Sequence, residues 1–318
     1  AAIVEYGEKY VSNKNKLSIR FGPVLGILKE ADYWARKSNA RQVTDKHVFK
    51  AFNDHRFRHN LYEQKIHDSY LDNTIMIDVS GAVIGQVNAL AVYQIGELSF
   101  GRPIRITAET YMGKKGVVNI EREAELSGST HDKGVLILSG YMGRTFAQQH
   151  PLSLSISITF EQSYFGIDGD SASSTELYAI ISSLADMPIK QGIAVTGSVN
   201  QKGKIQAIGD VNQKVEGFYQ VCKEKGLNGH QGVIIPTANI QNLMLKKEVI
   251  DAVKKKKFHI YQVSTVEEGI EILTGIPAGK PNKKGIYPEG TVYGAVQKKL
   301  REYVKRSEKL KKEIEDAE

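Results

Sequence analysis

This chain of 318 residues has few of the features that identify a secreted, membrane-spanning or zinc-binding protein. Cys222 is its only cysteine, so an internal disulfide is excluded and a reducing compartment such as the cytoplasm is favoured. Its 8 histidines are scattered, without the spacing of a zinc site. No run approaches about 18 consecutive apolar residues, and the N-terminus lacks the layout of a signal peptide. We therefore expect a cytoplasmic protein with no membrane span and no metal site.

The positive charge of the chain is concentrated at one end. The net charge is +7, and residues 280–318, with 11 Lys and Arg against 7 Asp and Glu, contribute +4 of it. The other 279 residues carry only +3. This balance gives nucleic acid only weak support as a partner.

The chain also lacks the Gly-x-x-x-x-Gly-Lys-Ser/Thr loop that holds nucleotide phosphates in many ATPases. We therefore expect no ATPase core within these residues. The first residue is Ala1 rather than methionine, which fits a segment of a longer polypeptide. Any reaction coupled to ATP would then need a part that lies outside this chain.

One serine stands where a helix is predicted to begin. Ser171 lies in the tetrapeptide Gly-Asp-Ser-Ala, and apolar residues recur at helical spacing over 174–184. Backbone N–H groups gather at a helix start and can hold a developing oxyanion. A serine hydroxyl, however, becomes a nucleophile only beside a base. Without such a base Ser171 would be an ordinary N-cap.

Lys214 is the candidate base. It begins a second stretch with helical spacing of apolar residues, and a cation is unfavourable near a helix N-terminus. Burial can lower a lysine pKa by roughly 3–5 units, which would leave a neutral amine able to accept a proton. The alternative is a solvated lysine, since the chain holds 43 Lys and Arg. Thr196 lies between the two residues in a β-rich segment, where threonine is ordinarily a strand former.

Taken together, residues 168–214 resemble the proteolytic domain of Lon-type Ser–Lys proteases. The form Gly-Asp-Ser-Ala-Ser is similar to the archaeal and the Lon-related bacterial branch. The resemblance covers about residues 70–277, including Asn-Ile-Glu-Arg-Glu from Asn119 and Lys-Gly-Val-Leu-Ile-Leu from Lys133, and looks closest to the bacterial Lon-related proteases.

This resemblance implies a role for each of the three residues. Ser171 would be the nucleophile, Lys214 the general base, and Thr196 the residue that orients the lysine amine. No cofactor is implied in the proteolytic site. ATP and magnesium are implied only for an ATPase part outside this chain.

Three acidic residues near the motifs leave the state of the site open. The family pattern has Gly-Gly before the lysine motif, whereas this chain has Gly209 and Asp210. Asp210 is either the N-cap of the following helix, which we favour, or an ion-pair partner that keeps Lys214 protonated and the site idle. Asp168 and Asp170 are candidates for the same inhibitory part.

Residues 1–70 read as a separate helical domain. Their pattern resembles the small helical lid of AAA+ ATPases, in which an arginine senses nucleotide. Arg20 matches that arginine, and the alternative is a helix-surface arginine. From Thr74 onward strands alternate with helices, both antiparallel and βα segments are expected, and the fold class is therefore α+β. Within this part we expect a strand at 135–138 and a helix at 141–150.

The predicted organisation is a lid-like domain at 1–70, a Lon-type proteolytic domain at 71–279, and a basic linker with a C-terminal helix at 280–318. Apolar residues over 293–314 recur at spacings of three and four, which fits either packing on the same domain or a contact between subunits.

We expect a serine endopeptidase, the proteolytic part of an ATP-dependent, hexameric Lon-like protease that degrades unfolded or regulatory proteins. One alternative is a non-catalytic Lon-like module that serves as a scaffold or a nucleic-acid-binding ring. Another is a hydrolase that pairs serine with a histidine. The candidates by position are His131, His150, His230 and His259.

Overall fold

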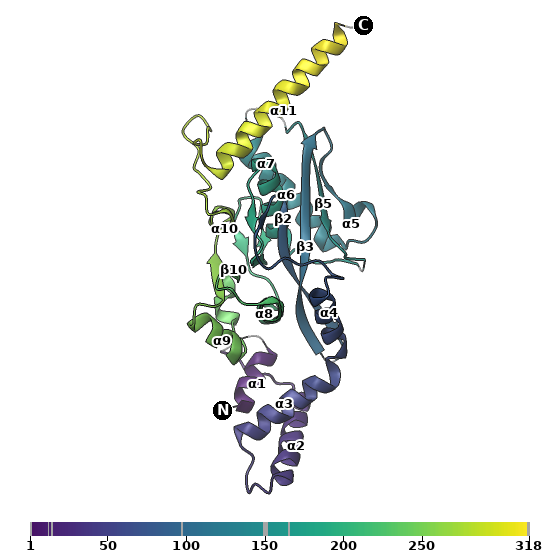
Figure 1. Ribbon diagram of the computed structural model, residues 1–318, viewed down its shortest axis with the longest axis vertical. Coiled ribbons are helices and arrows are strands. Elements are labelled where there is room, and N and C mark those ends of the chain that lie inside the picture. The colour runs from purple at the N-terminus through teal and green to yellow at the C-terminus, as the bar shows by residue number, and fades with distance from the viewer. Residues whose placement is uncertain are drawn as a thin grey trace.

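The computed structural model describes residues 2–11, 13, 15–96, 98–148, 152–164 and 166–316. Helices of the N-terminal part lie at one end, a mixed α/β body follows, and the last helix projects from the opposite end (Figure 1). The expected α+β class is confirmed. Within the described ranges, no helix has the length and apolar character needed to cross a bilayer.

The N-terminal part consists of helices around a small core of their own. Ile27 and Ala31 of one helix pack on Val48 and Ala51 of the next. The helices are α1 (Ala2–Tyr10), α2 (Phe21–Lys37), α3 (Asp45–His59) and α4 (Leu61–Leu71). Asn60 separates α3 from α4, and α4 runs into the body, where it packs on the helix at 211–225.

The body is built on a seven-stranded mixed sheet. Its strands follow the order β11-β10-β7-β2-β3-β5-β4. Their bounds are β2 (Gln86–Ile95), β3 (Leu98–Met112), β4 (Gly116–Asn119), β5 (Leu154–Phe160), β7 (Ile193–Val195), β10 (Gly232–Pro236) and β11 (His259–Val263). β2 and β3 form a long antiparallel hairpin, whereas β7, β10 and β11 run parallel. Two small ribbons pair β1 (Ala82–Val83) with β6 (Ile189–Lys190) and β8 (Ser198–Val199) with β9 (Ile205–Gln206).

Helices cover both faces of this sheet and give it two cores. Successive strand residues face opposite sides, so Ala89 joins one core and Leu90 the other. The first core, here the α7 core, packs α6 (Ser129–Phe146), α7 (Ser173–Ala185), α10 (Val266–Thr274) and the start of α11 (Val292–Glu315) on the sheet. The second, the α8 core, packs α4, α8 (Val211–Lys225) and α9 (Lys247–Lys254) on the other face. Two short helical segments, α5 (Ile120–Glu123) and the 3-10 turn Thr237–Asn242, complete the body.

The sheet opens between β2 and β7. These strands are paired only through Asn88 with Ala194 and Ala89 with Val195. β7 then ends, while β2 continues to Ile95 along β3. Segments from the two faces can therefore meet beyond the carboxyl end of β7, which is where ligands usually bind in open sheets with parallel strands.

The prediction of a strand at 135–138 is wrong, because these residues lie inside α6. A short apolar run is compatible with a strand or with a buried helix. Val135, Leu138 and Met142 are buried on one face of α6, and Leu136 is 62% exposed, as helical rather than alternating spacing requires. The expected helix at 141–150 ends at Phe146 instead, and residues 149 and 150 lie outside the described ranges.

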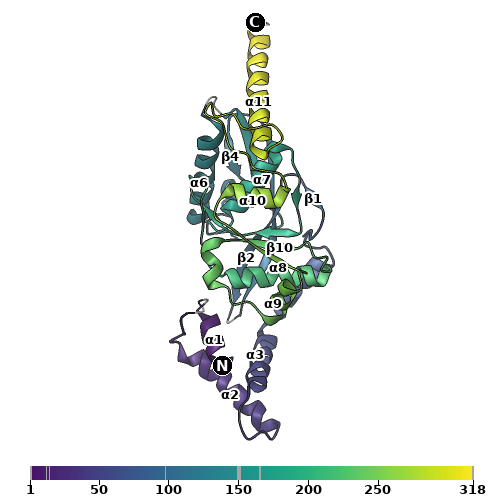
Figure 2. The same cartoon turned by 90° about the vertical axis from the view of Figure 1, so that its left-hand side faces the viewer.

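The expected apolar seam of the last helix divides into two halves. Val292, Tyr293, Val296, Leu300 and Tyr303 are buried against the α7 core. Beyond them α11 leaves the body, as both ribbon views show (Figures 1 and 2). The seam therefore packs on its own domain up to residue 303, and its last residues project into solvent.

Candidate active site

Ser171 lies in the turn that leads into α7, and the end of β7 fixes its backbone. The Ser171 carbonyl accepts hydrogen bonds from the N–H of Gly197 at 2.8 Å and from Oγ1 of Thr196 at 3.3 Å. Gly169 has a φ of 89°, a left-handed conformation that glycine adopts without strain and that lets the chain turn sharply. Ala172, not Ser171, stands at the N-cap of α7. The Ser171 hydroxyl is thus available for another partner.

Lys214 supplies that partner from the first turn of α8. Its Nζ lies 2.8 Å from Oγ of Ser171 and 3.1 Å from Oγ1 of Thr196, and it donates to both. The structure therefore brings together the three residues that the sequence singled out, although Ser171 precedes α7 and Lys214 lies in α8, which cover opposite faces of the sheet. Serine and lysine lie within the 2.6–3.2 Å that direct proton transfer requires.

The Lys214 side chain is almost completely withdrawn from solvent, with 4% of the residue exposed. This burial lowers the pKa of its amine to about 8, because the charged form loses its hydration. The carboxylates of Asp210 and Asp170 act in the opposite direction and favour the charged form, but they do not offset the burial. A large fraction of the amine is neutral at mildly alkaline pH and can then accept the Ser171 proton.

Asp210 stands at the N-cap position of α8, as expected. Its φ of 55° is left-handed, and its side chain makes no capping hydrogen bond. In the described part of the chain it also makes no ion pair with Lys214, as the short-range contacts of the lysine go to two hydroxyls. Its influence is a longer-range charge.

The other two aspartates have their own hydrogen bonds. Asp170 accepts from the Ser198 hydroxyl at 2.7 Å. Asp168 accepts from the backbone N–H of Gly169 at 2.8 Å and of His131 at 3.2 Å, and the Gly169 bond is the main reason that the pKa of Asp168 is lowered. These contacts fasten the turn before Ser171 to α6 and to β8.

A cavity of about 500 Å³ opens at Ser171 and Lys214. It is bordered by residues 89–93 of β2, by the turn 166–172 and by residues 207–210 before α8. Among the described residues, the backbone N–H groups of Ser171 and Ala172 have no protein acceptor. A carbonyl placed against Ser171 would therefore meet a nucleophile, a base and unused donors at a helix start.

Two glycines that the sequence analysis passed over set the position of α8. A Cβ on Gly217 would lie only 2.0 Å from the carbonyl oxygen of Gly101 in β3, and a Cβ on Gly101 would lie 2.0 Å from that of Gln213. Helix and strand backbones are therefore in direct contact beside Lys214. Glycine in the middle of a predicted helix is the sequence signal for such an approach.

Gly217→Ala is expected to lower peptide cleavage by tenfold or more (about 1.4 kcal/mol in the barrier), because α8 must move away from β3 and carry Lys214 from Ser171. The measurement is cleavage of a fluorogenic peptide at a temperature where circular dichroism shows the variant to be folded. Gly143→Ala is the matched control, since nothing lies within 4 Å of a Cβ on that helical glycine. Equal activity of Gly217→Ala and wild type would show that the close approach does not position the lysine.

The histidines do not provide an alternative base for Ser171 in the described residues. His131 is buried, with its Nε2 3.2 Å from Nδ2 of Asn119 and 3.7 Å from a carboxyl oxygen of Glu176. His259 bonds the Gly229 carbonyl, in a cavity that His230 also lines. His150 lies outside the described ranges. The same ranges contain no group of His, Cys, Asp and Glu that would hold a metal ion.

Glu176, five residues after Ser171, is a buried acid that the sequence analysis did not single out. Burial raises its pKa to about 8, so the carboxyl is mainly protonated at pH 7. It sits in α7 beside Asn119, whose Nδ2 lies 3.5 Å away. Glu176 does not line the cavity at Ser171. It lies against His131 of α6, so it contributes to the packing of the start of α7 on α6.

Arg20 is not part of this site. It precedes α2 in the N-terminal helical part, is exposed, and its backbone N–H donates to Oγ of Ser18 at 3.1 Å. Its assignment as a nucleotide sensor stays a prediction.

Comparison with known proteins adds two matches to family models. Residues 1–58 match the model described as archaeal LonB, AAA+ ATPase LID domain, and residues 139–275 match the Lon protease (S16) C-terminal proteolytic domain.

Individual relatives carry the same names. The chain is 41% identical over 222 residues to a protein named as a Lon protease homolog of Escherichia coli, and the match covers 69% of this chain and 38% of that protein. It is 35% identical over 267 residues to one from Haemophilus influenzae, covering 83% and 44%. An archaeal Lon protease of Thermococcus kodakarensis is 30% identical over 276 residues, covering 85% and 40%. The chain thus spans less than half the length of each relative.

Proposed function

This chain belongs to the Lon protease family, and on that premise we propose that it cleaves peptide bonds with a Ser171–Lys214 dyad. The observation that carries the proposal is the 2.8 Å contact between Oγ of Ser171 and Nζ of Lys214, with Oγ1 of Thr196 3.1 Å from the same amine. The low exposure of Lys214 supports it further, because only a neutral amine can act as a base.

In the proposed reaction, neutral Lys214 takes the Ser171 proton as the serine oxygen attacks the carbonyl carbon of the substrate. The oxyanion that forms is held by the unused N–H groups at the start of α7. Protonated Lys214 then gives its proton to the leaving amine, and an acyl-enzyme remains. Water attacks the ester, Lys214 accepts the water proton, and Ser171 recovers its hydrogen as the acid product leaves. Thr196 keeps the amine directed at Ser171 throughout.

Peptide cleavage is expected to rise with pH and to level off above about pH 8, because the pKa of Lys214 is lowered to about 8 and its neutral form is the active one. Below that value activity should fall about tenfold per pH unit. The measurement is kcat/KM of the 318-residue chain on a fluorogenic peptide from pH 6 to 10, with folding followed by circular dichroism.

The matched control for this profile is Asp170→Asn, which removes one of the two carboxylates that favour the charged amine. Its profile should move to lower pH. A wild-type profile that stays flat across the range, or a variant that shifts to higher pH, would refute Lys214 as the base.

The wider role extends beyond this chain and is also a proposal. We infer that the dyad serves an ATP-dependent protease that degrades unfolded or regulatory polypeptides, and that copies of the chain associate as a homo-oligomeric, hexameric ring. ATP and Mg²⁺ would bind to an ATPase part outside these residues, since the chain has no phosphate-binding loop, and Arg20 would sense the nucleotide from the lid. The match of residues 1–58 to an AAA+ lid supports this arrangement.

A further inference from the structure

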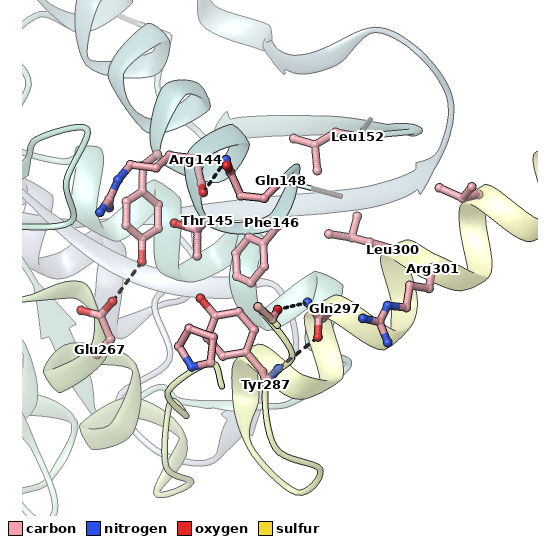
Figure 3. A pocket seen from close by; sticks show the side chains of 14 residues that line it. Arg144, Thr145, Phe146, Gln148, Leu152, Glu267, Tyr287, Gln297, Leu300 and Arg301 are labelled. Carbon is pink, nitrogen blue, oxygen red and sulfur yellow. Dashed lines mark hydrogen bonds between the residues drawn. The ribbon is translucent and has the colours of Figure 1, made fainter. Parts of the chain in front are cut away.

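A second cavity, which shares no lining residue with the one at Ser171, lies where α11 packs on the body. It has a volume of about 460 Å³ and lies between the end of α6, the loop 281–287 and the middle of α11 (Figure 3). Its walls are partly polar and partly apolar, and the apolar part is formed by Phe146, Leu152, Leu300 and Val304 together with Tyr287. This size suits a few side chains of a binding partner.

Two arginines give this cavity its charge. Arg144 and Arg301 lie on either side of Phe146 (Figure 3), and in the described ranges neither forms an ion pair. The single acidic side chain of the cavity, Glu267, already accepts a hydrogen bond from the Tyr141 hydroxyl at 3.4 Å. The cavity is therefore suited to a partner that offers carboxylates beside an aliphatic side chain.

The cavity is held in place by contacts on both sides. The amide of Gln297 donates to the Gly285 carbonyl at 2.8 Å and accepts from the Tyr287 N–H at 3.1 Å, which fastens the loop to α11. The hydroxyls of Tyr141 and Tyr293 lie 2.8 Å apart and are buried, which fastens α11 to α6. A preformed site of this kind loses little entropy when it binds.

The projecting end of α11 has the complementary chemistry. Leu310 and Ile314 are 48% and 60% exposed and continue the apolar seam beyond the body. Residues 313–316 read Glu-Ile-Glu-Asp, three carboxylates around one aliphatic side chain. By contrast, residues 298–312 hold 8 Lys and Arg against 2 Glu, so the helix is basic at its base and acidic at its end.

The acidic end cannot reach the cavity of its own copy. Arg301 and Ile314 are 13 residues apart on one continuous helix, which places them about 20 Å from each other. We propose that the acidic end of α11, residues 313–316, docks into the Arg144–Arg301 cavity of a second copy of this chain. Ile314 packs on the apolar side chains of the cavity, and the carboxylates of Glu315 and Asp316 pair with the two arginines.

Such a contact joins two different surfaces, and repeated contacts of this type close into a ring or continue as a filament. The contact involves only the end of one helix, so it supplements other contacts between copies rather than replacing them. It is independent of the dyad, because no residue of the cavity at Ser171 takes part.

The test is a charge exchange in the full 318-residue chain, followed by sedimentation velocity over a range of concentrations. Arg144→Glu with Arg301→Glu, or Glu315→Lys with Asp316→Lys, should each weaken self-association by about tenfold or more. All four changes in one chain should restore it, which a misfolded variant would not do. Lys65→Glu, a reversal at an exposed position of α4 near the other end of the molecule, is the control and should have no effect.

A cross-link locates the contact. Ile314→Cys in one copy should form a disulfide with Leu152→Cys in another, while a pair with the distant, 64% exposed Leu61→Cys should not. Cys222 is buried and does not compete. The proposal is overturned if the chain stays monomeric at all concentrations, if association ignores both charge reversals, or if both cysteine pairs cross-link equally. Inorganic phosphate that binds to the two arginines without changing self-association would likewise overturn the proposal.

Discussion

Ser171→Ala is expected to reduce peptide cleavage to background, by roughly 10⁴-fold, with little change in the free energy of unfolding. The hydroxyl is the group that attacks the substrate in the proposed reaction, and its partner in the structure is Nζ of Lys214 at 2.8 Å. Its backbone, which Thr196 and Gly197 hold, is unaffected by the loss of one oxygen. Casein and fluorogenic-peptide cleavage measure the effect, and thermal unfolding measures stability.

Ser174→Ala is the matched control for this experiment. The Ser174 hydroxyl is buried without a hydrogen-bond partner in the described residues, so its removal costs little and should leave cleavage intact. If Ser171→Ala cleaved at the wild-type rate, the nucleophile would be elsewhere, and Ser173 would be tested next. A wild-type chain without cleavage at any pH would instead favour the non-catalytic scaffold or nucleic-acid-binding module.

Lys214→Arg is expected to lose activity by about 10²–10⁴-fold over the whole pH range, although it keeps a long cationic side chain. Arginine stays protonated in proteins and cannot accept the Ser171 proton. Lys214→Ala should be equally inactive. The measurement is kcat/KM on a fluorogenic peptide between pH 6 and 10, because a merely structural role would let arginine substitute in part.

The control lies on the same helix. Lys223→Arg keeps an exposed ion pair with Glu248, which is 2.7 Å long, and should retain full activity. Thr196→Val should reduce activity less than the changes at Lys214, since the amine loses one of its two hydroxyl contacts but not its proton. A fully active Lys214→Arg would remove this lysine from the mechanism.

The sequence predicted the members of the site better than their surroundings. A serine at a helix start and a lysine in a first helical turn make chemical sense as a pair, which points to Ser171 and Lys214, whereas Thr196 follows only from the resemblance to Lon-type proteases. The structure adds what no local pattern contains. Lys214 is buried because α8 lies directly on β3, and that contact is decided by Gly101 and Gly217, which are far apart in the sequence.

The errors have physical reasons too. Residues 135–138 are a short apolar run, and such a run fits a strand as well as a buried helix face until the packing of α6 on α7 decides. Asp210 occupies the N-cap position that the sequence predicts, but with a left-handed φ of 55° and without the side-chain hydrogen bond that usually accompanies an aspartate there. The division of the chain at residues 70 and 280 stays a prediction.

The placement of Ser171 and Lys214 on opposite faces of the sheet has a consequence for a partly unfolded chain. An endopeptidase that stayed active while partly denatured would threaten every protein around it. In the proposed mechanism the nucleophile Ser171 stands just before α7 and the base Lys214 lies in α8, and these helices cover opposite faces of one sheet that opens between β2 and β7. The 2.8 Å contact between the two side chains therefore depends on the packing of both layers at once. On that mechanism, loosening of either layer would part the base from the nucleophile and end cleavage.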